Sequence, residues 1–286
     1  MSKKLRAASF SIIVNIFLIS MKAVVSVITG SLAILAELAH SIFDMVASVF
    51  AYLGIKKAEE PADETHLYGH EKFENLSSFA QTILIAVTSV LIIYEAFNRI
   101  AAPKKIEASE IGLIVMLVTI GIDYFISKYL HRTSREEGSA ALEADAYHFT
   151  TDLWGALAVI VGLVFVLLGF PIFDSIAAIA VAILMLWISY KLGKGSINVL
   201  MDRSPSADVM ERIGQIISGT HGVKGFHKLR ARYAGSKIIV EVHIQVALSM
   251  HIDRAHEVAH NVKKRLLKEV PQIKLVTIHI EPRNRK

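Results

Sequence analysis

The chain has 286 residues, of which 53% are hydrophobic and 20% are charged, and its formal net charge at pH 7 is +5. This apolar content is high for a soluble domain and typical of a membrane protein with a water-soluble appendage. Cysteine is absent, which excludes disulfides and thiolate metal sites, so any metal must be held by His, Asp, Glu or backbone oxygen. No basic helix or aromatic platform accompanies the positive charge, and no nucleic-acid partner is expected.

Six apolar blocks in the first part of the chain are each long enough for the roughly 20 residues of a membrane-spanning helix. They cover residues 10–29, 32–55, 76–97, 111–130, 141–168 and 173–192. Most flanking Lys and Arg residues fall on one side of the resulting zigzag, whereas Arg99, Lys104 and Lys105 fall on the other. By the positive-inside rule this predicts a multi-pass protein of the cell membrane with both termini in the cytoplasm.

Residues 204–286 return to the mixed polar pattern of a water-soluble domain. Helical periodicity at 207–218 and 253–269, with strand-like alternation at 225–233, 237–247 and 274–280, predicts the order αββαβ. Such an order builds a small sheet with helices on one face, as in ferredoxin-like and metallochaperone folds. The predicted organisation is therefore a six-helix transmembrane domain, residues 1–203, followed by an α+β cytoplasmic domain, residues 204–286. The small size of the second domain favours dimerisation.

Two apolar blocks contain the same short pattern, in which His40 precedes Asp44, and His148 precedes Asp152, by four residues. Residues four apart share one face of a helix. Two such helices facing each other would offer two imidazole nitrogens and two carboxylate oxygens, a tetrahedral set that suits zinc. Ionisable side chains in hydrocarbon are costly and persist mainly where they have a partner or face a polar pathway. We therefore predict a divalent-metal site made of these four residues.

Further ionisable residues lie near this pattern. Glu37 stands one turn before the first pair, and Asp145 stands three residues before His148. Either would serve as a supporting or proton-relay group, but solvation at a helix end explains Asp145 equally well. Asp123, in the middle of the fourth block, is a weaker candidate for a polar pathway.

Two other groups have metal-ligand chemistry. Asp63, His66 and His70 lie at short spacing between the second and third blocks, where Gly69 allows a tight turn; a solvated polar loop is an equally good explanation. In the C-terminal region, histidines recur in the strand-like segments and on the second helix. Together they indicate a second metal-binding region among these side chains, which are His227, His243, His256, His260, His279 and Glu281.

The six blocks, the paired HxxxD patterns, the DxxHxxxH loop before Lys72 and Glu74, and the histidine-bearing αββαβ tail together resemble the cation diffusion facilitator family of divalent metal transporters. The resemblance implies a homodimer in the lipid bilayer that exports metal in exchange for protons. Family members with His in the first transport position look like zinc transporters, so Zn²⁺ is the expected cargo and regulatory ligand. The resemblance assigns His40, Asp44, His148 and Asp152 to transport.

The same resemblance assigns Asp63, His66 and His70 to a loop site, and His227, His243, His256, His279 and Glu281 to a regulatory site between two tails. It also implies that Lys72 and Asp202 form a charge pair between protomers. Two alternatives stay open: a cargo of manganese, iron, cobalt or cadmium, and a membrane metal sensor that transports nothing. An enzyme is not expected, because four protein ligands leave no open position for a reactive water on zinc.

Overall fold

A computed structural model describes residues 1–29, 32–101, 110–167 and 172–283. By internal contacts the chain divides into two compact units, Met1–Ile197 and Asn198–Lys286. The first unit is helical, and the second combines helices with one β-sheet. The candidate metal ligands fall into separate groups within these units.

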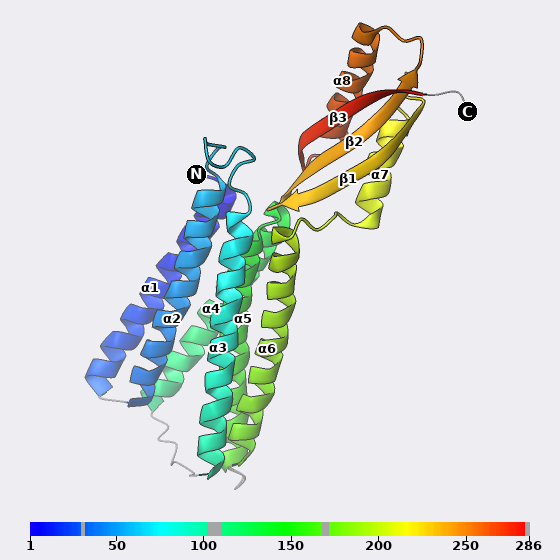
Figure 1. Cartoon of the computed structure of the whole chain (residues 1–286). Helices are drawn as coiled ribbons and strands as arrows, with labels where there is room; N and C mark the ends of the chain where they lie inside the picture. Colours follow the sequence, from blue (N-terminus) through cyan, green and yellow to red (C-terminus); the bar gives the residue numbers. More distant parts are fainter. Residues whose placement is uncertain (30–31, 102–109, 168–171, 284–286) are drawn as a thin grey trace. The chain divides into compact units, whose positions relative to one another are not determined.

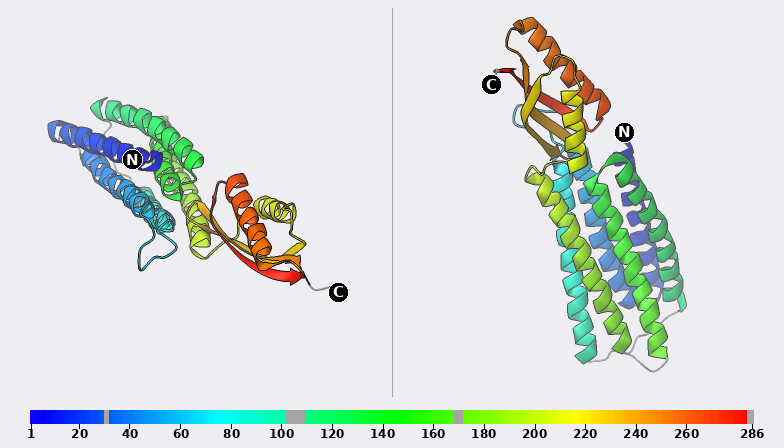
Figure 2. Two further views of the ribbon diagram at one scale, coloured as in Figure 1. Left: turned by 90° about the horizontal axis from the view of Figure 1, so that it is seen from above. Right: turned by 90° about the vertical axis from the view of Figure 1, so that its right-hand side faces the viewer.

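Six long helices form the first unit and run side by side as a bundle (Figures 1 and 2). They are α1 (Lys3–Thr29), α2 (Leu32–Ala58), α3 (Phe73–Ala101), α4 (Glu110–Glu137), α5 (Ala140–Leu167) and α6 (Ile172–Leu200). The prediction of six helices is confirmed. Several run past the predicted blocks, as α4 does beyond residue 130, where polar residues continue the helix and Arg132 pairs with Glu136 at i, i+4.

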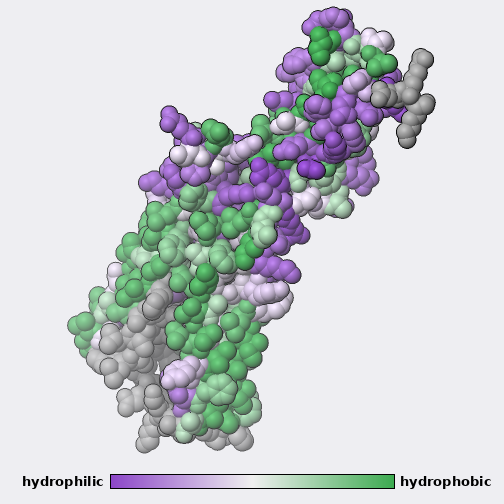
Figure 3. All heavy atoms as spheres, viewed as in Figure 1, coloured by the Kyte–Doolittle hydropathy of each residue, from purple (hydrophilic) through white to green (hydrophobic). Residues whose placement is uncertain are grey.

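The bundle buries small and polar side chains and exposes large apolar ones. Ala7 and Ala51 are fully buried, whereas Phe17 and Trp187 are more than half exposed. Apolar residues cover much of the bundle face seen in Figure 3. Small residues let helices approach closely in a membrane, where lipid solvates the outward apolar side chains. Among the described residues, four ranges are long and apolar enough to cross a bilayer: Lys3–Ile28, Phe73–Ala101, Ile114–Glu137 and Ser175–Leu200.

The second unit has the predicted αββαβ order. Its elements are α7 (Ala207–Ser218), β1 (Gly225–Ala234), β2 (Lys237–Ala247), α8 (Ile252–Glu269) and β3 (Ile273–Arg283). Strand β2 lies in the middle of the sheet, antiparallel to β1 and parallel to β3. The parallel pair is connected through α8, as a crossover connection requires.

One face of this sheet forms the hydrophobic core. Ile238, Val240, Val242 and Ile244 alternate along β2 and belong to one buried cluster with residues of α7 and α8, including Leu266. Because successive strand residues point to opposite faces, the residues between them, including His243, lie on the face away from the helices. The sheet therefore presents a helix-free face with histidines on it.

Candidate metal sites

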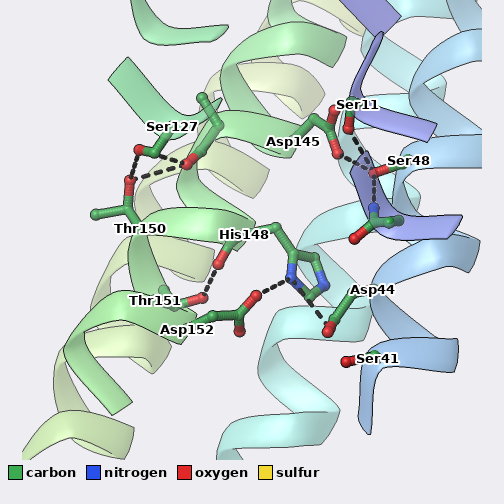
Figure 4. Close-up of polar contacts among 12 residues, drawn as sticks. Ser11, Ser41, Asp44, Ser48, Ser127, Asp145, His148, Thr150, Thr151 and Asp152 are labelled. Carbon is green, nitrogen blue, oxygen red and sulfur yellow. Dashed lines mark hydrogen bonds and ion pairs between the residues drawn. The ribbon is translucent and has the colours of Figure 1, made fainter. Parts of the chain in front are cut away.

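Three candidate ligands from two helices come together inside the helical bundle. Nδ1 of His148 lies 3.6 Å from Oδ1 of Asp44 and 3.6 Å from Oδ2 of Asp152. Asp44 comes from α2, and the other two residues lie one turn apart on α5, so the i, i+4 spacing directs both toward the same point (Figure 4). Asp44 and His148 are buried. The side chain of His40, also in α2, lies outside the described residues, as does that of Glu37.

Beside this cluster, a chain of hydrogen bonds joins three helices (Figure 4). Ser48 of α2 donates to Oδ1 of Asp145 on α5 at 2.7 Å. The Ser48 hydroxyl also accepts a hydrogen bond from Asn15 of α1 at 2.8 Å and shares one with Ser11 at 2.8 Å. Asp145 is fully buried, so solvation at a helix end is the wrong explanation for it. These bonds link α1, α2 and α5 next to the Asp44–His148 pair.

The three loop residues also converge. Nε2 of His70 lies 3.2 Å from Oδ2 of Asp63, Nδ1 of His66 lies 3.4 Å from Oδ1, and the two imidazole rings are 4.6 Å apart between centroids. Asp63 accepts hydrogen bonds from the backbone N–H of His66 and from the side chain and N–H of Thr65, which lower the pKa of its carboxyl group. Gly69, with φ of 92°, makes the turn between the histidines.

The loop geometry suits a bound cation. Nδ1 of the buried His70 ring donates to the carbonyl oxygen of Pro61 at 3.1 Å. In the neutral ring, Nε2 therefore directs a lone pair toward the Asp63 carboxylate, and among the described residues this nitrogen has no hydrogen-bond partner. A proton or a metal ion between the two atoms would remove the repulsion between them.

In the second unit, three histidines form a row across the sheet. His227 pairs with His243, and His243 pairs with His279, in the strand register. Glu281 follows two residues after His279 and accepts hydrogen bonds from Nδ1 of His243 at 2.7 Å and Nε2 of His227 at 2.6 Å. These two bonds lower the pKa of Glu281 to about 2. Nε2 of His279 lies 3.6 Å from Oε1 of the same carboxylate.

The fifth predicted tail residue is not part of this row. His256 is exposed on α8, and α8 packs against the opposite, apolar face of the sheet. Within one chain, His256 is therefore separated from the carboxylate of Glu281 by the sheet. Asp202, the predicted partner of Lys72, accepts a hydrogen bond from Arg232 at 2.8 Å within the second unit.

Two family models match the chain. A family model described as the cation efflux transmembrane domain matches residues 8–201, about two thirds of the chain. The chain belongs to the cation efflux, or cation diffusion facilitator, family. A second model from this family, described as the cytoplasmic domain of a cation efflux protein, matches residues 205–283. Membership confirms the resemblance found in the sequence, and with the apolar helices it identifies an integral membrane protein.

Several curated proteins are similar to the chain. Metal tolerance protein C1 of Arabidopsis thaliana is 33% identical over 91% of this chain, which spans only 59% of that protein's length. The cation-efflux pump FieF of Serratia proteamaculans is 29% identical over 89% of this chain and 84% of its own length. An uncharacterized transporter of Methanocaldococcus jannaschii is 29% identical over 95% of both chains.

Two solved structures of a smaller domain are similar to part of the chain. A nickel form of the MamM CTD is 28% identical, with a TM-score of 0.27 over 28% of this chain and all of that one. A cadmium form is 29% identical, with a TM-score of 0.27 over 27% of this chain and 98% of that one.

The structure adds polar residues that sequence reasoning did not single out as functional. Lys22 is buried on α1 and donates from Nζ to Oγ of Ser41 at 2.8 Å. Glu74, buried in the first turn of α3, accepts hydrogen bonds from Lys4 at 2.6 Å and from Ser139 at 2.6 Å. For Lys22 a signal was present in the sequence, because it is the single charged residue within the apolar block 10–29.

Proposed function

We propose that this chain is an efflux transporter of divalent metal cations, with Zn²⁺ as its cargo, and that it works by proton-coupled antiport. The observation that carries the proposal is the convergence of Asp44, His148 and Asp152 inside a bundle of membrane-spanning helices. One ligand atom from each lies within 4.8 Å of those of the other two, and His40 of the same helix as Asp44 would complete a tetrahedral set. Nitrogen and carboxylate oxygen ligands suit zinc.

The same atoms explain the coupling to protons. Metal binding requires neutral imidazole and ionised carboxylate, so a proton and a metal ion compete for the His148 ring and its two carboxylate neighbours. Histidine titrates near neutral pH and therefore exchanges one for the other over a physiological range. In an inward-facing state the site would load from the cytoplasm. After the bundle rearranges, protonation from the other side would help to release the ion.

The proposed organisation assigns residues 1–203 to transport and residues 204–286 to a cytoplasmic regulatory and dimerisation domain, with both termini in the cytoplasm of a cell-membrane protein. Support comes from the row of His227, His243 and His279 around Glu281. His256 of a second chain would be free to approach the helix-free face of this sheet. Zinc shared between two tails would then bias the bundle toward one state, while Asp63, His66 and His70 form an additional binding site.

Reconstitution into proteoliposomes tests the transport proposal. We expect zinc to move against a counter-flow of protons when a pH gradient is imposed, and Asp152→Asn to reduce the flux by about 10–100-fold, since it replaces an anionic carboxylate ligand by a neutral amide. Glu136→Gln is the matched control, because Glu136 lies at an exposed end of α4 paired with Arg132. Its flux should equal that of the wild type.

The other outcomes separate the alternatives. Flux of manganese, iron, cobalt or cadmium without flux of zinc would keep the mechanism and replace the cargo. Zinc binding without gradient-driven flux would refute transport and favour a membrane sensor. Full activity of Asp152→Asn would refute the assignment of the site.

A further inference from the structure

One exposed face of α6 changes from apolar to aromatic to basic along the helix. Trp187 and Tyr190 are 58% and 65% exposed. Lys191 and Lys194 stand one turn after them and are exposed too. These four residues are at i, i+3, i+4 and i+7, so they form one surface of the helix, the aromatic-basic face. Ile183, one turn before Trp187, is also exposed. This order matches the passage from the hydrocarbon of a bilayer to its headgroups.

The two lysines of this face fold back over the two rings. Nζ of Lys191 lies 5.4 Å from the centroid of the Trp187 ring, and Nζ of Lys194 lies 5.7 Å from that of Tyr190. Attraction to a ring holds each ammonium group in place, but an ammonium group has three N–H donors. Among the described residues, neither lysine forms an ion pair or a side-chain hydrogen bond. Both therefore keep donors for an anion.

The charges around these lysines leave an excess of positive charge. Glu143, exposed near the start of α5, attracts Lys191. Arg135, in the last turn of α4, attracts the same carboxylate. One carboxylate thus stands against Arg135, Lys191 and Lys194. The ligand that complements this surface is an anion.

Helix α4 repeats the arrangement. Nζ of Lys128 lies 5.8 Å from the ring centroid of Tyr124, one turn before it, and both residues are exposed. Because α5 runs in the opposite direction, α4 and α6 end at the same end of the bundle (Figure 2). On both helices, an aromatic ring therefore precedes a lysine toward that end. This recurrence fits a bilayer interface, where aromatic and basic residues concentrate.

We propose that the aromatic-basic face of α6 binds the headgroup of an anionic phospholipid. The ammonium groups of Lys191 and Lys194 contact the lipid phosphate, while Trp187 lies against the glycerol backbone and the upper acyl chain. One lipid molecule offers a phosphate and an apolar chain in the same order in which this face offers lysines and apolar side chains. The inference depends on the membrane location of the bundle and not on the proposed transport.

The expected selectivity follows from charge. Phosphatidylcholine and phosphatidylglycerol have the same phosphate, but the choline cation cancels its charge, whereas glycerol does not. Each basic residue near an anionic lipid surface strengthens binding by about fivefold. Two lysines therefore give a preference of about 20-fold for phosphatidylglycerol.

Trp187 can report on the lipid beside it. The chain has two tryptophans, so Trp154→Phe leaves Trp187 as the single one. The whole chain in detergent micelles is titrated with brominated phosphatidylglycerol or brominated phosphatidylcholine, which quench a tryptophan that they contact. We expect half-maximal quenching at an about 20-fold lower mole fraction of phosphatidylglycerol. Adding Lys191→Gln and Lys194→Gln together should bring the two lipids within about twofold of each other. Arginine at both positions keeps the charge and should keep the preference.

The matched control combines Lys263→Gln and Lys264→Gln, which remove two exposed lysines from α8 and should leave the preference unchanged. Equal quenching by the two lipids in the Trp154→Phe protein would overturn the inference, and so would a preference that survives in the glutamine variant of α6. Absence of quenching by either lipid would overturn it too. A lower mass of that variant in mass photometry would then identify the face as a contact with a second copy of the chain.

Single substitutions keep the test decisive if the double variant of α6 does not fold. Lys191→Gln and Lys194→Gln are then titrated separately, and each should weaken the binding of phosphatidylglycerol by about fivefold. Neither should change the binding of phosphatidylcholine by more than about twofold. Unchanged binding of phosphatidylglycerol by both single variants would refute the role of the lysines.

Discussion

The hydrogen bond between Ser48 and Asp145 joins α2 and α5, the two helices that carry the residues of the proposed transport site. Its contribution to stability can be predicted. Asp145→Ala removes the acceptor of a fully buried hydroxyl that is held at 2.7 Å. The hydrogen bond itself contributes only about 0.6 kcal/mol between membrane helices. Loss of a partner by a buried polar group costs more, about 1–3 kcal/mol, although the Ser11 hydroxyl at 2.8 Å is a second acceptor toward which the Ser48 hydroxyl can turn. We therefore expect Asp145→Ala to lower the free energy of unfolding by about 1–3 kcal/mol, with a value near the lower end where the Ser48 hydroxyl turns to Ser11.

Asp145→Asn separates hydrogen bonding from charge in the same place. Its amide oxygen still accepts from Ser48, so we expect a loss of less than about 1 kcal/mol. Ser89→Ala is the matched control, because Ser89 is also fully buried but donates only to the carbonyl of Ile85 within its own helix, at 2.7 Å. Stability is measured by thermal unfolding in detergent, and zinc uptake in proteoliposomes.

The loss of zinc uptake should follow the loss of stability, and should be larger for Asp145→Ala than for Asp145→Asn. When the bond between α2 and α5 is lost, Asp44 and His148 are no longer held in register, and a displacement of about 1 Å at a reacting site can cost about 100-fold. We expect Asp145→Ala to lose most zinc flux and Asp145→Asn to keep more of it. Equal stability of Asp145→Ala and Ser89→Ala would refute the reasoning. Equal damage from the two Asp145 variants would show that charge, rather than the hydrogen bond, matters there.

Two further predictions concern the C-terminal unit. Gly222 has φ of 92°, and an added Cβ would lie 2.5 Å from Cγ2 of Val258, so Gly222→Ala should lower stability by about 1–3 kcal/mol in thermal unfolding; an unchanged midpoint would contradict this. Because the folded-state pKa of Glu281 is lowered to about 2, its stabilising contribution is complete above the ordinary carboxyl pKa and is lost as pH falls toward 2. The difference in melting temperature between wild type and Glu281→Gln should therefore shrink from pH 5 to pH 2.5, and a constant difference would show that the Glu281 charge contributes nothing.

Local sequence signals were enough to predict the fold. Blocks of about 20 apolar residues have few alternatives to a membrane helix, and the alternation along β2 distinguishes its buried residues, such as Val240 and Val242, from exposed Glu241. The helix ends were less predictable. The residues of α4 beyond 130 are polar yet helical. Backbone hydrogen bonds continue a helix whether or not its side chains are apolar, so the end of an apolar block does not mark the end of the helix.

The candidate sites were predictable where ligands recur at short spacing. The i, i+4 pattern brings His148 and Asp152 together, and a shared strand face brings Glu281 to His279. Contacts between distant segments were not predictable in this way. The bond from Ser48 to Asp145 spans 97 positions, and it depends on which helices become neighbours, which periodicity does not reveal. The position of His256 relative to Glu281 was not predictable for the same reason. Spacing in the sequence does not show which face of the sheet is covered by α8, the helix that carries His256.

Helix α1 contributes no proposed ligand, yet it determines the surroundings of the transport site. Ser11, Asn15 and Lys22 stand at i, i+4 and i+11, which places them on one face of the helix, and all three are buried. On that face, Asn15 and Ser11 contact Ser48, four residues after Asp44, while Lys22 contacts Ser41, three residues before it. A shift of α1 along α2 would therefore change the hydrogen bonds to Ser48 and the hydrogen bond from Lys22 to Ser41, which lie on either side of Asp44 in the sequence of α2. Movement of a helix without ligands would thus disturb the segment of α2 that carries Asp44.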